Sequence, residues 1–184
     1  MNTMWIVIAA IGIIGLYLWS LYNALVALKT QIEEAWSQID VQLKRRADLI
    51  PNLVETVKGY AKHEKGVFTE VTKARSALMG AKTLPKMAAA SDALSGALGK
   101  LFAIAENYPQ LRANENFVHL QKELSDTEDK VAYSRQYYNS VVNDYNTKIR
   151  TFPNTLFNEM FGFGEKEFFA ANDAERKSVK VDFS

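Results

Sequence analysis

Residues 4–28, MWIVIAAIGIIGLYLWSLYNALVAL, contain no charged side chain, and Lys29 is the first charge of the chain. A helix rises ~1.5 Å per residue, so roughly 20 apolar residues cross the ~30 Å hydrocarbon core of a bilayer. The segment 4–21 is long enough for this. Trp5 lies near one end and Tyr17, Trp19 and Tyr22 near the other, where aromatic rings favour the headgroup level. The stretch predicts a transmembrane anchor over residues 1–28.

We expect this anchor to stay uncleaved. A secretory signal has a positive n-region and a small-x-small cleavage site, whereas this chain starts Met-Asn-Thr and continues its helical pattern past Ala27. Lys29 follows the span and no Lys or Arg precedes it, so the positive-inside rule predicts the N-terminus outside the cell membrane and the body in the cytoplasm. The opposite orientation stays open, because long domains translocate largely regardless of charge.

Beyond the anchor, apolar residues repeat at spacings of three and four, which is typical of a long helix packed on one face. The run is Leu25, Leu28, Ile32, Ala35, Ile39, Leu43, Ala47, Ile50, Val54, Val57 and Ala61. Pro51 predicts a kink, and the charged stretch closed by Gly66 predicts the end of the helix. A second stripe follows from Val67 to Leu78, and Gly80 to Pro85 is either a loop or a local irregularity.

A third apolar face follows Met87 among many small residues and ends at Tyr108-Pro109. The last long helix is expected to start at Asn114 or Asn116, with a stripe of Phe117, Leu120, Leu124, Val131, Tyr138, Val142, Tyr145 and Ile149. No period-two alternation persists. The predicted fold is all-α: a transmembrane helix that continues into an elongated antiparallel bundle of three to four helices over residues 29–169. Residues 152–169 are rich in Phe and either pack on the bundle or bind a partner. Residues 170–184 are expected to form a loosely ordered tail.

Composition excludes several functions. Lys plus Arg number 22 and Asp plus Glu 21, which argues against a nucleic-acid partner, and the chain has no cysteine. His63-Glu64 lacks the second histidine of a zinc helix, because position 67 is Val67, and neither a phosphate-binding loop nor a G-x-S-x-G motif occurs. The sequence therefore predicts no enzyme, no cofactor and no metal.

Charged residues on the helical stripes form the candidate site. Glu128 and Arg135 fall on or beside the seam of the last helix, where an unpaired charge costs several kcal/mol. We expect a structural polar layer between the first and last long helices, made of Arg45, Arg46, Asp48, Glu128 and Arg135. The alternative for Lys44-Arg45-Arg46 is contact with anionic lipid or phosphate, although the cluster follows the span by some 20 residues, ~30 Å of straight helix.

The chain resembles the LemA family, and the resemblance extends from the anchor to Phe169. It is carried by Tyr22-Asn23, Leu25-Val26, residues 35–46 (AWSQIDVQLKRR), 48–54 (DLIPNLV), 57–64 (VKGYAKHE) and 105–111 (AENYPQL), and later by Phe117, Leu120, Glu128, Arg135, Tyr138-Asn139, Tyr145-Asn146, Phe152-Pro153, Gly162-Phe163 and Phe168-Phe169. The resemblance implies a membrane protein of helical-bundle fold with an N-terminal transmembrane helix.

These observations together predict a non-catalytic, membrane-tethered helical scaffold that forms a homo-oligomer or binds other membrane proteins. The rival hypothesis is a lipid-surface or membrane-stress sensor that uses Lys44–Arg46 and the Phe-rich segment as amphipathic contacts.

Overall fold

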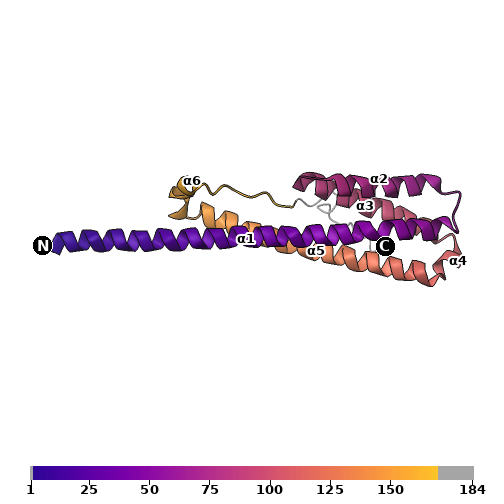
Figure 1. Cartoon of the computed structure of the whole chain (residues 1–184), viewed down its shortest axis with the longest axis horizontal. Helices are drawn as coiled ribbons and strands as arrows, with labels where there is room; N and C mark the ends of the chain where they lie inside the picture. The colour runs from indigo at the N-terminus through magenta and orange to yellow at the C-terminus, as the bar shows by residue number, and fades with distance from the viewer. Residues whose placement is uncertain (1, 170–184) are drawn as a thin grey trace, which may run out of the picture. The chain divides into compact units, whose positions relative to one another are not determined.

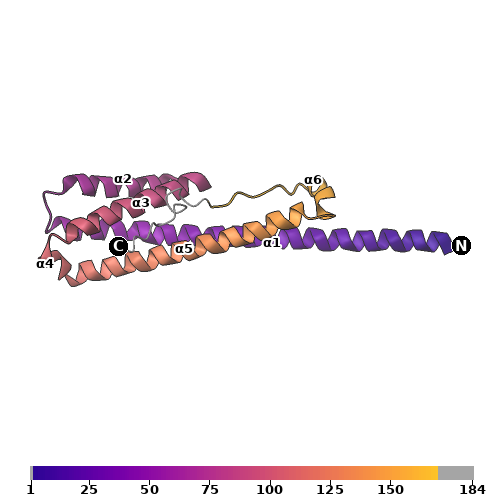
Figure 2. The same cartoon turned by 180° about the vertical axis from the view of Figure 1, so that it is seen from behind.

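The computed structural model describes residues 2–169, so the prediction for the tail at 170–184 lies outside the described residues. Its elements are α1 (Asn2–Lys58), α2 (Lys65–Gly80), α3 (Leu84–Ala105), α4 (Pro109–Arg112), α5 (Glu115–Arg150), the 3-10 turn η1 (Asn154–Leu156) and α6 (Asn158–Phe161). Figures 1 and 2 show these elements from opposite sides. Within residues 2–169 every regular element is helical and no strand forms, which confirms the all-α class.

The described residues fall into two compact units, to both of which α1 and α5 contribute. The anchor unit comprises residues 2–37 and 136–168, and the bundle unit comprises residues 38–135 with Phe169. Each unit is described by itself below.

The bundle unit is an antiparallel four-helix arrangement of α1, α2, α3 and α5. Two pairs of contacts give the directions of α2 and α5 relative to α1. Lys58 lies over the ring of Phe68 while Arg75 reaches Ala47, so α2 runs against α1. Tyr60 meets Asn114 while Arg45 meets Glu123, so α5 also runs against α1.

Apolar residues at helical spacing build the core of the bundle unit, as the periodicity predicts. From Ile39 to Ala61 all seven residues of the predicted stripe are buried, and Leu53 joins them. The stripe of α5 is buried as well, except that Leu120 is half-exposed. Between Leu124 and Val131 the buried position belongs to Thr127, whose hydroxyl donates to the Leu124 carbonyl over 2.9 Å.

Pro51 lies inside α1 without ending it. Because proline has no backbone N–H, the carbonyl of Ala47 four residues earlier loses its usual donor. Arg75 of α2 replaces that donor: its Nε donates to the Ala47 oxygen over 2.8 Å. The helix accordingly continues to Lys58.

The predicted end of this helix at Gly66 is wrong. The helix stops at Lys58, immediately before Gly59, and Gly66 lies in the first turn of α2 instead. Residues 81–83 form the loop between α2 and α3, and Pro85 occupies the first turn of α3, where its missing N–H costs nothing. The start of the last helix is confirmed at Glu115, with the side chain of Asn114 accepting from the Phe117 N–H over 3.0 Å.

The anchor unit pairs α1 with the C-terminal part of α5. Trp36 packs edge-on against Tyr138, with ring centroids 6.1 Å apart, while Tyr17 reaches Asn154, so these two helices also run in opposite directions. After α5 the chain turns through η1 and α6 and then runs extended beside α5. This return places the Phe-rich segment next to the apolar helix.

Candidate functional site

Arg46 is the centre of a polar cluster in the bundle unit. Only 1% of its surface is exposed. One guanidinium nitrogen donates to the Ser95 hydroxyl over 3.0 Å, and the other forms an ion pair with the carboxylate of Glu128. Ser95 also donates to the second oxygen of Glu128 over 2.9 Å. Three helices, α1, α3 and α5, thus meet at one charge.

Burial and the neighbouring carboxylates shift the pKa of Arg46 in opposite directions. Burial lowers the pKa of the guanidinium from its ordinary value, and the carboxylates of Glu128 and Asp92 oppose that shift. The Nε atom is buried and has no hydrogen-bond partner in the protein. The side chain of Glu128, in contrast, is 49% exposed. The buried member of the pair is therefore the cation.

Arg135 extends this cluster along α3 and α5. Its guanidinium lies 3.8 Å from the Asp92 carboxylate and 4.9 Å from the centre of the Phe169 ring. Both charged side chains are largely buried, with exposed fractions of 15% and 21%. A cleft of about 230 Å³ opens here, lined by Ser91, Asp92, Ser95, Glu128, Val131, Ala132 and Arg135. Its carboxylates face arginines, an arrangement that fixes charge rather than one that leaves a base available.

The structure brings some of the predicted polar residues together and leaves Arg45 and Asp48 outside the cluster. Arg46 and Glu128 pair directly. Arg45 pairs instead with Glu123 over 2.9 Å on the surface. Asp48 is exposed on α1, away from these pairs.

Sequence reasoning missed Asp92 and Ser95. They lie three residues apart and therefore share one face of α3. Two polar residues at this spacing inside an apolar, small-residue stretch were the signal that could have identified them. The many alanines and glycines around them hid this signal.

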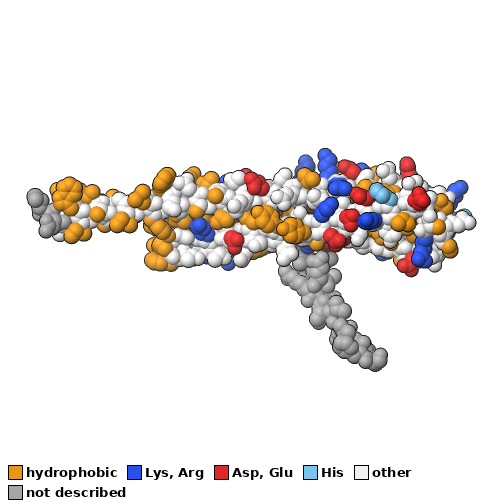
Figure 3. All heavy atoms as spheres, turned by 90° about the horizontal axis from the view of Figure 1, so that it is seen from below, with side chains coloured by type: hydrophobic (Ala, Val, Ile, Leu, Met, Phe, Trp, Pro, Cys, Tyr) orange, Lys and Arg blue, Asp and Glu red, His pale blue; other side chains and the backbone are white. Residues whose placement is uncertain are grey.

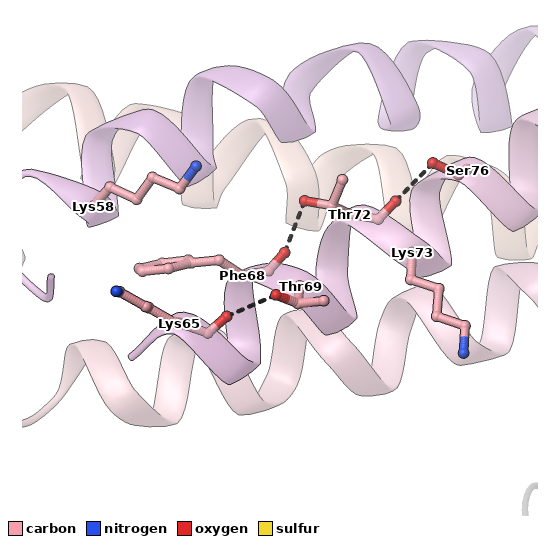
Figure 4. A pocket seen from close by; sticks show the side chains of 7 residues that line it. All are labelled: Lys58, Lys65, Phe68, Thr69, Thr72, Lys73 and Ser76. Atoms are coloured by element: carbon pink, nitrogen blue, oxygen red, sulfur yellow. Dashed lines mark hydrogen bonds between the residues drawn. The ribbon is translucent and has the colours of Figure 1, made fainter. Parts of the chain in front are cut away.

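A shallow groove lies between α1 and α2 of the bundle unit. It measures about 690 Å³ and is lined by Lys58, Lys65, Phe68, Thr69, Thr72, Lys73 and Ser76. Figure 4 shows Lys58 and Lys65 near the ring of Phe68, while Thr72 and Ser76 each donate back to the carbonyl one turn earlier on α2. With its hydroxyls engaged by their own helix, the groove presents mainly an aromatic ring and lysines.

The two histidines do not form a metal site in the described residues. His63 and His119 are both exposed. Among residues 2–169 no group of three His, Cys, Asp or Glu side chains is placed to hold a metal ion.

The N-terminal part of α1 is an uncovered apolar rod. From Met4 to Ser20 every residue is exposed except Leu18, which is half-exposed. Figure 3 shows hydrophobic side chains spaced along this part of α1, with no Lys, Arg, Asp or Glu side chain among them on the face in view. By length and composition two described helices, α1 and α3, are long and apolar enough to cross a bilayer. Met87, Leu94, Leu98 and Leu101 of α3 are buried, so α3 is a core helix, whereas α1 fits membrane anchoring.

Beside the apolar part of α1 lies the segment 152–163, here called the aromatic cap. Tyr17 donates to the side-chain oxygen of Asn154 over 2.5 Å. The Tyr22 ring packs against Phe161 and Phe163 at centroid distances of 5.6 and 5.7 Å. These contacts fix the cap along α1 within the anchor unit.

Residues 164–168, here called the strap, run extended along α5. Tyr138 and Tyr145 donate to the carbonyls of Glu167 and Gly164, each over 3.1 Å. Asn146 exchanges two hydrogen bonds of 2.9 Å with the backbone of Lys166. Burial raises the pKa of both tyrosines, and Glu167 adds to the shift of Tyr138. The polar groups of α5 thus hold the strap largely through its backbone, and Arg150 of α5 adds an ion pair with the Glu165 side chain over 2.5 Å.

Comparison with known proteins agrees with this architecture. The chain is 29% identical to Protein LemA of Metamycoplasma hominis over 88% of its own length and 74% of that protein. It is 28% identical to Magnetosome protein MamQ of Magnetospirillum gryphiswaldense and 25% identical to Magnetosome protein MamQ 2 of Paramagnetospirillum magneticum. Those matches cover 80% and 83% of this chain but only 64% and 66% of the two magnetosome proteins. The pattern that defines the LemA family matches residues 35–183, and the chain belongs to the LemA family.

Proposed function

We propose that this protein is a non-catalytic scaffold that α1 tethers to the cell membrane and that associates with further copies of itself. The observation that carries the proposal is the uncovered apolar rod from Met4 to Ser20, which continues without a break into a helix of the bundle. An apolar surface of this length is stable in lipid and costly in water. The N-terminus lies outside and the bundle unit in the cytoplasm.

A scaffold fits the chemistry of the bundle unit. Its most deeply buried charge, Arg46, serves to join three helices. The names of the relatives describe no reaction, and two of them refer to an assembly, the magnetosome. A role in organising other components of a membrane accounts for both facts.

Self-association has a candidate contact on the bundle unit. Tyr133 of α5 is 71% exposed, and with Gln42, Asp126, Asp129, Lys130 and Ser134 it lines a groove of about 460 Å³ between α1 and α5. Exposed tyrosines beside polar groups are enriched at protein interfaces because the ring supplies apolar area and the hydroxyl a hydrogen bond. We expect a second copy to bind here.

Light scattering of the full chain in detergent micelles tests this proposal. The protein mass, corrected for detergent, should be a multiple of the 20.7 kDa protomer. Tyr133→Ser should shift that mass toward one protomer, and Lys122→Ser, an exposed change elsewhere on α5, should not. A single protomer at every concentration of the unmodified chain argues against self-association.

The rival function, sensing of an anionic lipid surface, has less support from the basic cluster. Arg46 is buried and paired with Glu128, and Arg45, although exposed, is paired with Glu123; Lys44 is exposed as well. Hydrogen exchange of the full chain in nanodiscs with and without phosphatidylglycerol separates the two functions. Protection of residues 38–50 that depends on the anionic lipid favours the sensor, and unchanged exchange favours the scaffold.

A further inference from the structure

The aromatic cap presents large apolar side chains to the outside. Phe152, Leu156 and Met160 are 75%, 64% and 67% exposed. They come from η1, α6 and the turn before them, so three neighbouring parts of the cap share this exposure. From Thr151 to Gly164 the sequence has one charged residue, Glu159. Figure 3 shows hydrophobic side chains over this region as well as along α1.

The position of the cap along α1 identifies what covers it. Tyr17 and Tyr22, the two residues of α1 that hold the cap, belong to the uncharged stretch that ends before Lys29. Leu21 and Leu25 are buried within the anchor unit, at 5% and 0% exposure. The part of α1 free to contact lipid on all sides therefore ends at about Ser20.

That free part is shorter than the hydrocarbon core of a bilayer. Residues 4–20 span about 25 Å at ~1.5 Å per residue, against a hydrocarbon thickness of ~30 Å. The missing depth falls just beyond Ser20, beside Leu21 and Tyr22, where the cap packs against α1. The exposed apolar side chains of the cap then continue the lipid-facing surface of α1.

The polar groups of the cap are directed inward and are bonded. Asn154 donates to the carbonyl of Lys148 over 2.8 Å, and Asn158 donates to the carbonyl of Ile149. These carbonyls lie in the last turn of α5, where no helical N–H remains to satisfy them. Backbone groups that enter the edge of a bilayer need such internal partners.

We infer that the aromatic cap is a second membrane contact, which inserts Phe152, Leu156 and Met160 into the acyl–headgroup boundary of the leaflet from which α1 emerges. The inference goes beyond the scaffold proposal, because it assigns the cap to lipid and not to a second copy. The chain then contacts the membrane through two segments, the N-terminal part of α1 and the aromatic cap, which lie near opposite ends of the described residues.

Site-directed spin labelling of the full chain in vesicles of phosphatidylcholine and phosphatidylglycerol tests the inference. The chain has no cysteine, so single-cysteine variants accept one nitroxide each. The probe is Met160→Cys, Ile8→Cys is the reference inside the bilayer, and Val118→Cys, half-exposed on α5, is the reference in water. Oxygen concentrates in the bilayer and a nickel chelate stays in water, so their collision rates with the label report its surroundings.

The ratio of oxygen to nickel accessibility at position 160 should be several-fold higher than at 118 and should approach the ratio at 8. Leu156→Cys provides a second position at which no buried contact is removed. A ratio at both cap positions equal to that at 118 overturns the inference. So does magnetic broadening between labels at 160, because it shows that a second copy covers the cap. If the ratio at position 8 also equals that at 118, the N-terminal helix itself is not in the bilayer and the scaffold proposal fails. If the ratio at 8 is high and only the cap positions are water-like, the cap inference alone fails.

Discussion

The ion pair of Arg46 and Glu128 should respond very differently to the loss of either partner. Glu128→Gln leaves the cation of Arg46 in a site that is 1% exposed, without its main counter-charge. Removing one partner of a buried pair costs 3–5 kcal/mol, and the nearby carboxylate of Asp92 keeps the cost at the lower end, about 3 kcal/mol.

Arg46→Met removes the buried charge and keeps most of the side-chain volume. The carboxylate of Glu128 is 49% exposed, so water can solvate it when its partner is gone. The main loss is the hydrogen bond to Ser95, about 1 kcal/mol. We therefore expect Glu128→Gln to be less stable than Arg46→Met by about 2 kcal/mol.

Thermal unfolding of the full chain in detergent micelles, followed by far-UV circular dichroism, measures the difference. At about 2–4 °C per kcal/mol, Glu128→Gln should lower Tm by about 6–12 °C and Arg46→Met by about 2–4 °C. The double variant should resemble Arg46→Met, because no buried charge is left unpaired. Lys122→Gln, an exposed change on α5, should leave Tm within about 2 °C, the effect of about 0.5 kcal/mol. A larger loss for Arg46→Met than for Glu128→Gln would refute the reasoning.

Three further predictions concern Arg135 and the strap. Arg135→Gln removes a charge that lies 3.8 Å from the Asp92 carboxylate and 4.9 Å from the centre of the buried Phe169 ring. This change should lower the free energy of unfolding, measured in urea, by about 1–2 kcal/mol. Unchanged stability would contradict a structural polar layer. Asn146→Ala removes both hydrogen bonds to the strap, should cost about 2 kcal/mol and should speed amide exchange at the strap, measured by mass spectrometry. The raised pKa of Tyr138 and Tyr145 means that their stabilisation is complete below the unfolded tyrosine pKa of about 10 and is lost as the pH rises through the higher folded value. The unmodified chain should therefore lose more stability between about pH 8 and about pH 11 than Tyr145→Phe does, in urea titrations at each pH, and equal losses would exclude the hydroxyl as the cause.

Periodicity and charge were sufficient to predict the four long helices from the sequence, although not the short α4, η1 and α6. The stripe from Ile39 to Ala61 is buried as expected, because a three-four spacing can face only one side of a helix. The uncharged N-terminal stretch predicted the uncovered rod for a similar reason. The error at Gly66 arose because a glycine can lie in a first turn as well as after a last one, and composition does not distinguish the two positions.

The candidate site was less accessible to sequence reasoning. The sequence predicted a polar layer that includes Arg46 and Glu128, and the structure pairs these two residues. The partner of Arg135 is Asp92, which interrupts no large apolar stripe and so gave a weak signal. The strap gave little signal, because α5 holds it largely through backbone atoms, which leave no pattern in the side chains. The ion pair between Arg150 of α5 and Glu165 of the strap is a side-chain contact that the periodicity did not indicate.

The hydrogen bond from Arg75 to the Ala47 carbonyl makes two distant positions depend on each other. Arg75 supplies what Pro51 removes, so Pro51→Ala should restore the ordinary helical bond and make Arg75 dispensable, whereas Arg75→Ala alone should expose an unsatisfied acceptor. Loss of the arginine first is therefore the costly evolutionary route, and loss of the proline first is the neutral one. Among related sequences, an alanine at the position of Arg75 should be found mainly where the proline has already gone.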